Sequence, residues 1–152
     1  MFPEQITDIP ERAFSNTSIS GPLILPEHVL TIGYSAFENC KNLSSLQLTQ
    51  CLKRIESSAF YNCMSLSGPL ALPESLIYIG DSAFSCDSYS YGQPGIQFSG
   101  ELYLPKNLEY IGHAAFYGTS GFTGNLVIPD KISKISSHTF RCSGFTGSLI
   151  IS

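Results

Sequence analysis

The sequence predicts a solenoid: residues 1–152 form one domain of about six stacked coils, with short parallel β-strands and little helix. Three observations carry this prediction. A phenylalanine returns at separations of 23, 23, 24, 32 and 24 residues, other apolar positions return in phase with it, and L-x-L triplets end at proline in most copies. A unit of this length cannot enclose its own core, but stacked units bury a continuous one.

Every copy contains the same apolar positions. Each repeated phenylalanine lies five residues after an isoleucine, and the repeats begin three residues before that isoleucine, near residues 6, 29, 52, 76, 108 and 132. Stacking places equivalent side chains on one another. We therefore expect a structural ladder made of Phe14, Phe37, Phe60, Phe84, Phe116, Phe140, Ile9, Ile32, Ile55, Ile79, Ile111 and Ile135.

The L-x-L triplets alternate as half-buried strands do, and proline ends four of the six because it lacks a main-chain donor. Each coil is thus expected to carry one parallel strand there. A second extended segment, as at Leu76 to Ile79, is expected to turn into one helical or 3₁₀ turn at the phenylalanine. Repeat four carries extra residues within 85–93, and such insertions loop out on one face and are often functional.

The composite pattern L-x-x-I-G-x-x-A-F-x-x-C-x-x-L-x-G-x-L-x-[LI]-P resembles the BspA-like, treponemal-type class of leucine-rich repeats across essentially the whole chain. The resemblance implies a right-handed leucine-rich repeat solenoid of a surface or secreted protein. It also implies a protein ligand on a host or neighbouring cell, and a location at the cell surface or outside the cell.

The chain starts within a repeat and stops on a strand, without the polar capping repeats that solenoids need. We expect a fragment, or one unit of a longer array. Because an unpaired strand edge is a template for another chain, end-to-end self-association through the uncapped coils is a further expectation.

Composition argues against several classes of partner. A net charge of −4 and only eight Lys and Arg leave no basic stripe for nucleic acid. No apolar run approaches the roughly 18 residues of a membrane span, so no membrane insertion is expected. The first ten residues have neither a basic start nor an apolar core, and they predict no signal peptide in the chain as given.

The sequence also predicts no enzyme, no metal site and no cofactor. His28, His113 and His138 occupy three different repeat positions, and no carboxylates or thiols are arranged around them. Cys40 and Cys63 both lie three residues after their phenylalanine, so stacking brings their Cα atoms within about 5 Å, inside disulfide range. A bridge and two free buried thiols both remain open, and the free thiols are favoured because cysteine is a good small core residue.

Tyrosines provide the main functional signal. Tyr78 and Tyr110 directly precede a column isoleucine, Tyr103 is the middle residue of its L-x-L triplet, and Tyr89 and Tyr91 lie in the insertion. Outward tyrosines on a rigid surface suit protein recognition, although they are also good strand formers that cover neighbouring coils. These five are the candidate partner-binding residues.

The sequence therefore predicts a non-enzymatic macromolecule-binding module, for protein–protein interaction or adhesion, in a surface or secreted protein. One alternative is a structural spacer within a longer surface protein. A second alternative is carbohydrate binding through exposed tyrosines, which requires polar side chains that converge beside an exposed ring.

Overall fold

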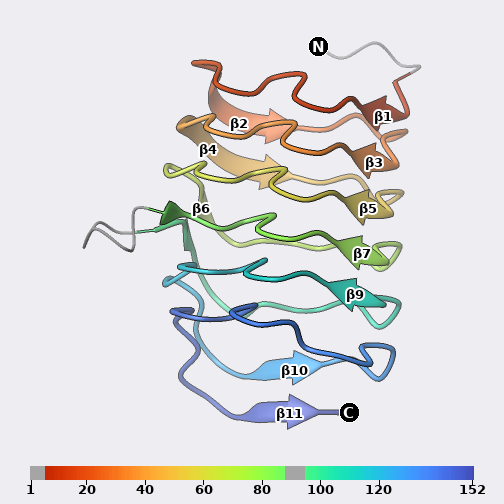
Figure 1. Ribbon diagram of the computed structural model, residues 1–152, viewed down its shortest axis with the longest axis vertical. Helices are drawn as coiled ribbons and strands as arrows, with labels where there is room; N and C mark the ends of the chain where they lie inside the picture. The colour runs from red at the N-terminus through yellow and green to blue at the C-terminus, as the bar shows by residue number, and fades with distance from the viewer. Residues whose placement is uncertain (1–5, 88–94) are drawn as a thin grey trace.

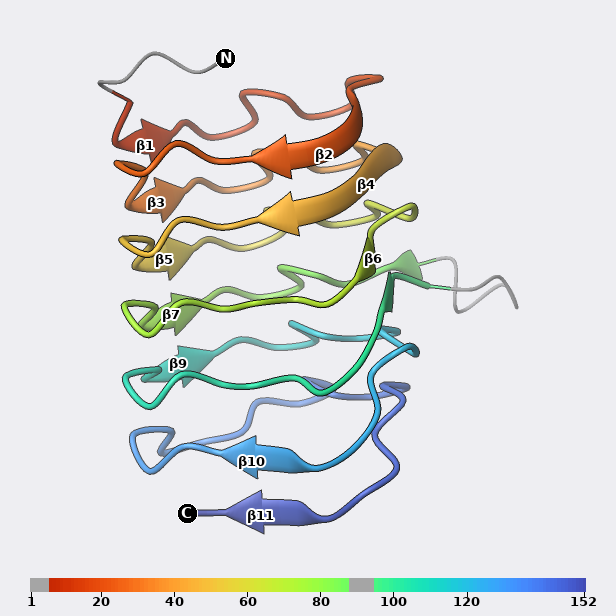
Figure 2. The same ribbon diagram turned by 180° about the vertical axis from the view of Figure 1, so that it is seen from behind.

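Coils of similar shape stack along one axis, with the two chain ends at opposite ends of the stack (Figure 1). The computed structural model describes residues 6–87 and 95–152. Each coil crosses the front of Figure 1 and returns along the back, which Figure 2 shows from behind; we call these the front layer and the back layer. The path is right-handed and the paired strands are parallel. The predicted solenoid is confirmed.

The front layer holds a five-stranded parallel sheet in the order β1-β3-β5-β7-β9. Each strand has two residues, and the second is a repeated isoleucine that pairs with the isoleucine of the next coil. These isoleucines are buried, while the residues before them face outward. The strands are β1 (Asp8–Ile9), β3 (Thr31–Ile32), β5 (Arg54–Ile55), β7 (Tyr78–Ile79) and β9 (Tyr110–Ile111).

The isoleucine column ends at β9. Ile135, the sixth predicted ladder position, is 44% exposed and lies outside any strand. Among the described residues, no main-chain hydrogen bond joins residues 133–135 to β9. The prediction is wrong at this position, because without that pairing the side chain is not held against the core.

Each repeated phenylalanine lies in a run of tight turns. The residue two before it adopts left-handed backbone angles in all six copies, and the residue two after it does so in five. Around Phe37 these are Ser35 and Asn39, with φ of 51° and 58°. The Phe37 N–H donates to the Ala59 carbonyl of the next coil at 2.8 Å, whereas the Ala36 N–H bonds within its own coil. The predicted helical turn is therefore wrong, because left-handed residues interrupt a helix and every second donor is used between coils.

The six phenylalanine rings form one continuous stack. Successive ring centroids lie 5.1 to 5.7 Å apart, with interplanar angles of 16° or less. The four central rings are at most 1% exposed. A second aromatic column of Phe98, Phe122 and Phe145 stacks beside it and contacts it edge-on. Aromatic rings thus fill much of the core in the C-terminal half.

The back layer contains three separate two-stranded sheets, β2-β4, β6-β8 and β10-β11. Repeats three and four lack the expected L-x-L strand: residues 70–72 and 102–104 make no main-chain hydrogen bond with a neighbouring coil in the described part of the chain. Their leucines are still buried, so side-chain packing holds these segments, while main-chain pairing lies upstream at β6 and β8. The strands are β2 (Ser20–Ile24), β4 (Asn42–Gln47), β6 (Ser67–Gly68), β8 (Gln97–Phe98), β10 (Leu126–Ile128) and β11 (Leu149–Ile151).

A small hydrogen-bond donor lies three residues after most of the phenylalanines. The Cys63 thiol donates to the Phe37 carbonyl of the preceding coil at 3.0 Å, and the Thr119 hydroxyl donates to the Phe116 carbonyl at 2.7 Å. Cys63 is a free thiol, and burial raises its pKa, which keeps it protonated as a donor. The donors of this column are Thr17, Cys40, Cys63, Thr119 and Ser143.

Replacing Phe60 with Ala is expected to lower the free energy of unfolding by about 3 to 5 kcal/mol, because its ring stacks on both neighbours. Phe140→Ala should cost less, since Phe140 is only partly buried. Urea titrations of both variants measure the difference. Equal losses at the two positions would contradict a stack stabilised by neighbouring coils.

This column of donors predicts that two substitutions of nearly equal shape at position 63 differ in their effect on stability. Cys63→Val should be less stable than Cys63→Thr by about 0.5 to 1.5 kcal/mol, because only threonine can donate to the Phe37 carbonyl. Unfolding in urea compares the two, and each serves as the packing control of the other. Equal stability of the two variants would mean that position 63 requires only a side chain of this size, and not a hydrogen-bond donor.

Candidate functional site

An aromatic column lies on the outer surface of the front layer. Arg54, Tyr78 and Tyr110 occupy the first positions of β5, β7 and β9 and pair in register across the sheet. The two tyrosine rings stack with centroids 4.9 Å apart and an interplanar angle of 11°. The Arg54 guanidinium carbon lies 3.9 Å from the centre of the Tyr78 ring. Cation and rings therefore form one continuous stack across three coils.

Carboxylates hold this column in place. One oxygen of Asp81, Oδ1, accepts hydrogen bonds from the Tyr110 hydroxyl at 3.2 Å and from the His113 main-chain N–H at 2.8 Å. The Arg54 Nε donates to Glu56 Oε1 at 2.7 Å. Desolvation and then the charge of Asp81 raise the pKa of Tyr110, so its hydroxyl remains a donor to the carboxylate.

The structure brings together two histidines that occupy different positions in their repeats. The rings of His113 and His138 lie 5.3 Å apart in an edge-to-face arrangement, and His113 Nδ1 is 2.7 Å from the Ser137 hydroxyl. Their separation of 25 residues, close to one repeat, is the sequence signal for this contact. They extend the polar surface next to Tyr110. We name Arg54, Tyr78, Asp81, Tyr110, His113 and His138 the front patch.

The remaining candidate tyrosines do not join the front patch in the described structure. Tyr103 lies in residues 101–104, which run along the back layer, whereas Tyr78 and Tyr110 lie in the front layer (Figures 1 and 2). Tyr89 and Tyr91 lie outside the described residues. The structure thus separates the predicted site into a stacked pair on one layer and a single ring on the other.

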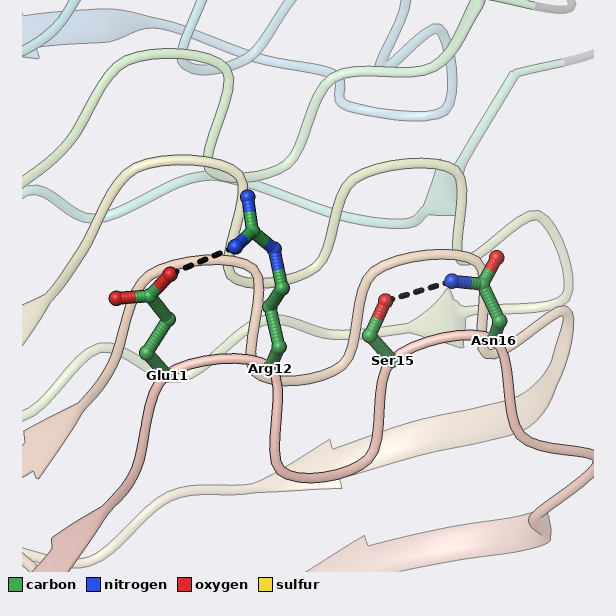
Figure 3. A network of polar contacts seen from close by, with 4 residues as sticks. All are labelled: Glu11, Arg12, Ser15 and Asn16. Carbon is green, nitrogen blue, oxygen red and sulfur yellow. Dashed lines mark hydrogen bonds and ion pairs between the residues drawn. The ribbon is translucent and has the colours of Figure 1, made fainter.

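The turn of the first coil presents a more polar surface (Figure 3). Arg12 Nη1 lies 2.8 Å from Glu11 Oε1, and Asn16 Nδ2 donates to the Ser15 hydroxyl at 2.8 Å. The Arg12 and Glu11 side chains are largely exposed, so their ion pair contributes at most about 1 kcal/mol. Arg12 also lies 5.0 Å from the centre of the Tyr34 ring. Among the described residues, the Tyr34 ring is not part of a stacked aromatic pair.

The middle residues of the L-x-L triplets form an outward row along the back layer. Four of the six are large and apolar, and Tyr103 is the largest and is 52% exposed. The row consists of Ile24, Gln47, Ala71, Tyr103, Val127 and Ile150. Beside Tyr103 the surface is hollowed into a groove of about 570 Å³ between residues 101–106 and 125–131. The back layer therefore holds a second candidate surface.

Two further features bear on function. Within residues 6–87 and 95–152, no helix is long and apolar enough to cross a membrane. In the same residues, His, Cys, Asp and Glu side chains do not gather in groups of three or more that could hold a metal ion.

Comparison with known proteins identifies the family. A family model described as a BspA type leucine rich repeat region matches residues 1–93 and 96–152, in 6 copies. The match covers nearly the whole chain, so this chain belongs to the BspA type leucine rich repeat family. No curated protein matches the chain.

A solved structure supports the same assignment. The chain is similar to the leucine rich repeat protein TpLRR of T. pallidum, known from a crystal structure, with 26% sequence identity and a TM-score of 0.71. The alignment covers 96% of this chain and 66% of that chain, so this chain spans about two thirds of the length of TpLRR.

The front patch predicts a loss of stability in alkali. Desolvation raises the pKa of both Tyr78 and Tyr110 in the folded protein. Above the ordinary tyrosine pKa of about 10, the unfolded chain has released protons that the folded chain still holds, so the free energy of unfolding falls as pH rises through the folded pKa values. Urea midpoints across this range should fall less steeply in Tyr78→Phe/Tyr110→Phe. An unchanged slope would contradict the raised pKa values.

Proposed function

We propose that this chain is a non-enzymatic macromolecule-binding module that recognises a protein partner, as part of a surface or secreted protein. The observation that carries the proposal is the Arg54–Tyr78–Tyr110 stack, which presents 39% of the Tyr110 surface to solvent. Arginine and tyrosine are enriched among residues that contribute most of the energy at protein interfaces. Membership of a leucine rich repeat family supports the same function.

The recognition mechanism is contact by a preorganised surface. The front patch rests on strands that are hydrogen-bonded in a five-stranded sheet and on turns that are hydrogen-bonded between coils. Binding therefore orders little main chain, and the stacked rings have little rotamer freedom to lose. Asp81 anchors the Tyr110 hydroxyl before any partner arrives.

The chemistry of the patch indicates the kind of partner surface that fits it. The rings offer an apolar face with a cation at one end, while Asp81 and Glu56 place carboxylates at its margin. A partner segment with an aromatic or aliphatic side chain next to a basic group would complement both parts. The proposed location is the cell surface or the extracellular space, where such partners are displayed.

A binding screen tests the proposal. The chain and the variant Tyr78→Ser/Tyr110→Ser are applied to immobilised extracellular-matrix and cell-surface proteins, and binding is followed by interferometry. We expect a partner whose affinity falls at least about tenfold in the variant, because truncating a central aromatic contact typically costs more than about 1 kcal/mol and the variant truncates two, while about 1.4 kcal/mol corresponds to tenfold. Tyr34→Ser, which removes an equally exposed tyrosine outside the front patch, serves as the matched control.

Circular dichroism and thermal melting of both variants establish that they are folded. Absence of any protein ligand for the folded chain would contradict the proposal and favour a spacer role within a longer surface protein. Equal losses in the Tyr34 control and the double variant would show that the contact lies elsewhere.

A further inference from the structure

The back layer contains a groove with the size of a small-molecule site. It lies between residues 101–106 of repeat four and residues 125–131 of repeat five, and its volume is about 570 Å³. This is within the range of about 300 to 1,000 Å³ that is typical of ligand pockets. The segments that line it run along the back layer, opposite the layer of the front patch (Figure 2). A ligand bound there would not contact Tyr78 or Tyr110.

An exposed aromatic ring forms one wall of this groove. Tyr103 stands between the buried leucines at positions 102 and 104, so its side chain points away from the core and is 52% exposed. Val127 of the next coil lines the same groove and is 43% exposed. Hydrogen bonding to the Glu74 carboxylate raises the pKa of Tyr103, so the hydroxyl stays protonated. The groove thus offers a platform for an apolar face of a ligand.

Polar side chains converge beside this ring. Glu101, Lys106 and Asp130 line the groove, and in residues 6–87 and 95–152 none of them has an ion-pair or hydrogen-bond partner. Lys131 donates to Asn107, which is outside the groove. The side-chain carbonyl oxygen of Asn125 accepts from the Ser148 N–H, and its amide group has no hydrogen-bond partner among the described residues. Carboxylate acceptors and ammonium and amide donors are therefore available to a ligand.

The main chain beside the groove also bears on how a ligand could form hydrogen bonds there. Residues 102–104 make no main-chain hydrogen bond to β10 in the described structure, although β10 pairs with β11 on its other side. Across the groove itself, therefore, no described hydrogen bond joins the main chain of residues 102–104 to that of β10. The Glu101 side chain reaches across to Gly124 of the next coil, where a Cβ atom would collide with it. The lack of a side chain at Gly124 allows Glu101 to lie along the groove.

The charge of the lining restricts the ligand. Two carboxylates, of Glu101 and Asp130, oppose two ammonium groups, of Lys106 and Lys131, so neither an anion nor a cation is favoured by net charge. A purely apolar ligand would desolvate all four groups without replacing their hydrogen bonds. A neutral ligand that combines an apolar ring face with many hydroxyl groups satisfies both the tyrosine and the polar rim. We propose that this groove binds a neutral saccharide that stacks on Tyr103.

Saturation-transfer NMR tests this proposal directly. The probes are neutral di- to tetrasaccharides of glucose, galactose, mannose and N-acetylglucosamine, with sialylated and sulfated oligosaccharides as charged comparisons. We expect a neutral probe to bind, and Tyr103→Ala to weaken it by about tenfold, the loss expected for an aromatic contact. Tyr103→Phe should retain most of the affinity because it keeps the ring. Tyr110→Ala, which removes an exposed ring from the other layer, should leave saccharide binding unchanged.

Several outcomes would overturn the inference. These are no binding of any neutral saccharide by the folded chain, equal affinity in wild type and Tyr103→Ala, or preference for the charged probes. Displacement of the saccharide by a short unstructured peptide at lower concentration would assign the groove to a peptide instead. Because the saccharide site and the front patch have separate variants, failure of either proposal is distinguishable from failure of the other.

Discussion

The hydrogen bond from each phenylalanine N–H to the next coil is the constraint on which the rest of this structure depends. Five such bonds run along the stack, and all are 2.8 or 2.9 Å long: Phe14 to Ala36, Phe37 to Ala59, Phe60 to Ala83, Phe84 to Ala115 and Phe116 to Thr139. They fix the register of every coil against the next, and so place each ring on a ring and, from Ile9 to Ile111, each isoleucine beside an isoleucine. The left-handed residue two positions before each of these phenylalanines turns its N–H group toward the neighbouring coil.

The spacing between coils also explains why glycine follows the column isoleucine in some repeats, although glycine buries little apolar surface. Gly80 follows the column isoleucine, and a Cβ atom there would collide with the main chain of Ser57 in the preceding coil. A Cβ atom at Gly112 would likewise collide with the main chain of Asp81, which is in the coil before Gly112. At a separation of about 4.8 Å between hydrogen-bonded segments, a side chain directed at the neighbouring main chain has no room. Stacking rather than turn geometry therefore favours glycine at positions 80 and 112.

The period of the apolar residues was sufficient to predict the solenoid, because burial of a column requires in-phase repetition whatever the local main-chain geometry. The helical turn that the sequence predicts at the phenylalanine is wrong, since small residues before an aromatic suit both a helical turn and a left-handed one. The asparagine two residues after Phe14, Phe37 and Phe60 was the available signal, because asparagine tolerates left-handed angles. The extended segment predicted at Leu76 to Ile79 contains β7, although a two-residue strand is too short to show alternation.

The candidate surfaces were predictable only in part. That Tyr78 and Tyr110 face outward side by side follows from their common repeat position, and the structure stacks them. Tyr103 also faces outward, but its assignment to the other layer needs the path of the whole coil. His113 and His138 are in contact although they occupy different positions in their repeats, and His138 has left-handed backbone angles. A comparison of equivalent repeat positions alone could not predict this contact.

Outward columns set the size of any binding surface in this architecture. Interior columns are held by burial, and TpLRR shares the coil geometry at a TM-score of 0.71 with only 26% identity, so most residues differ without a change of fold. An outward column contributes one side chain per coil, and the Tyr78–Tyr110 pair therefore spans only two coils, about 10 Å. A standard protein interface needs about 800 Å² from each partner. A protein bound at the stacked tyrosines must for this reason also cover the neighbouring columns, and Asp81, His113 and His138 lie where that contact would extend.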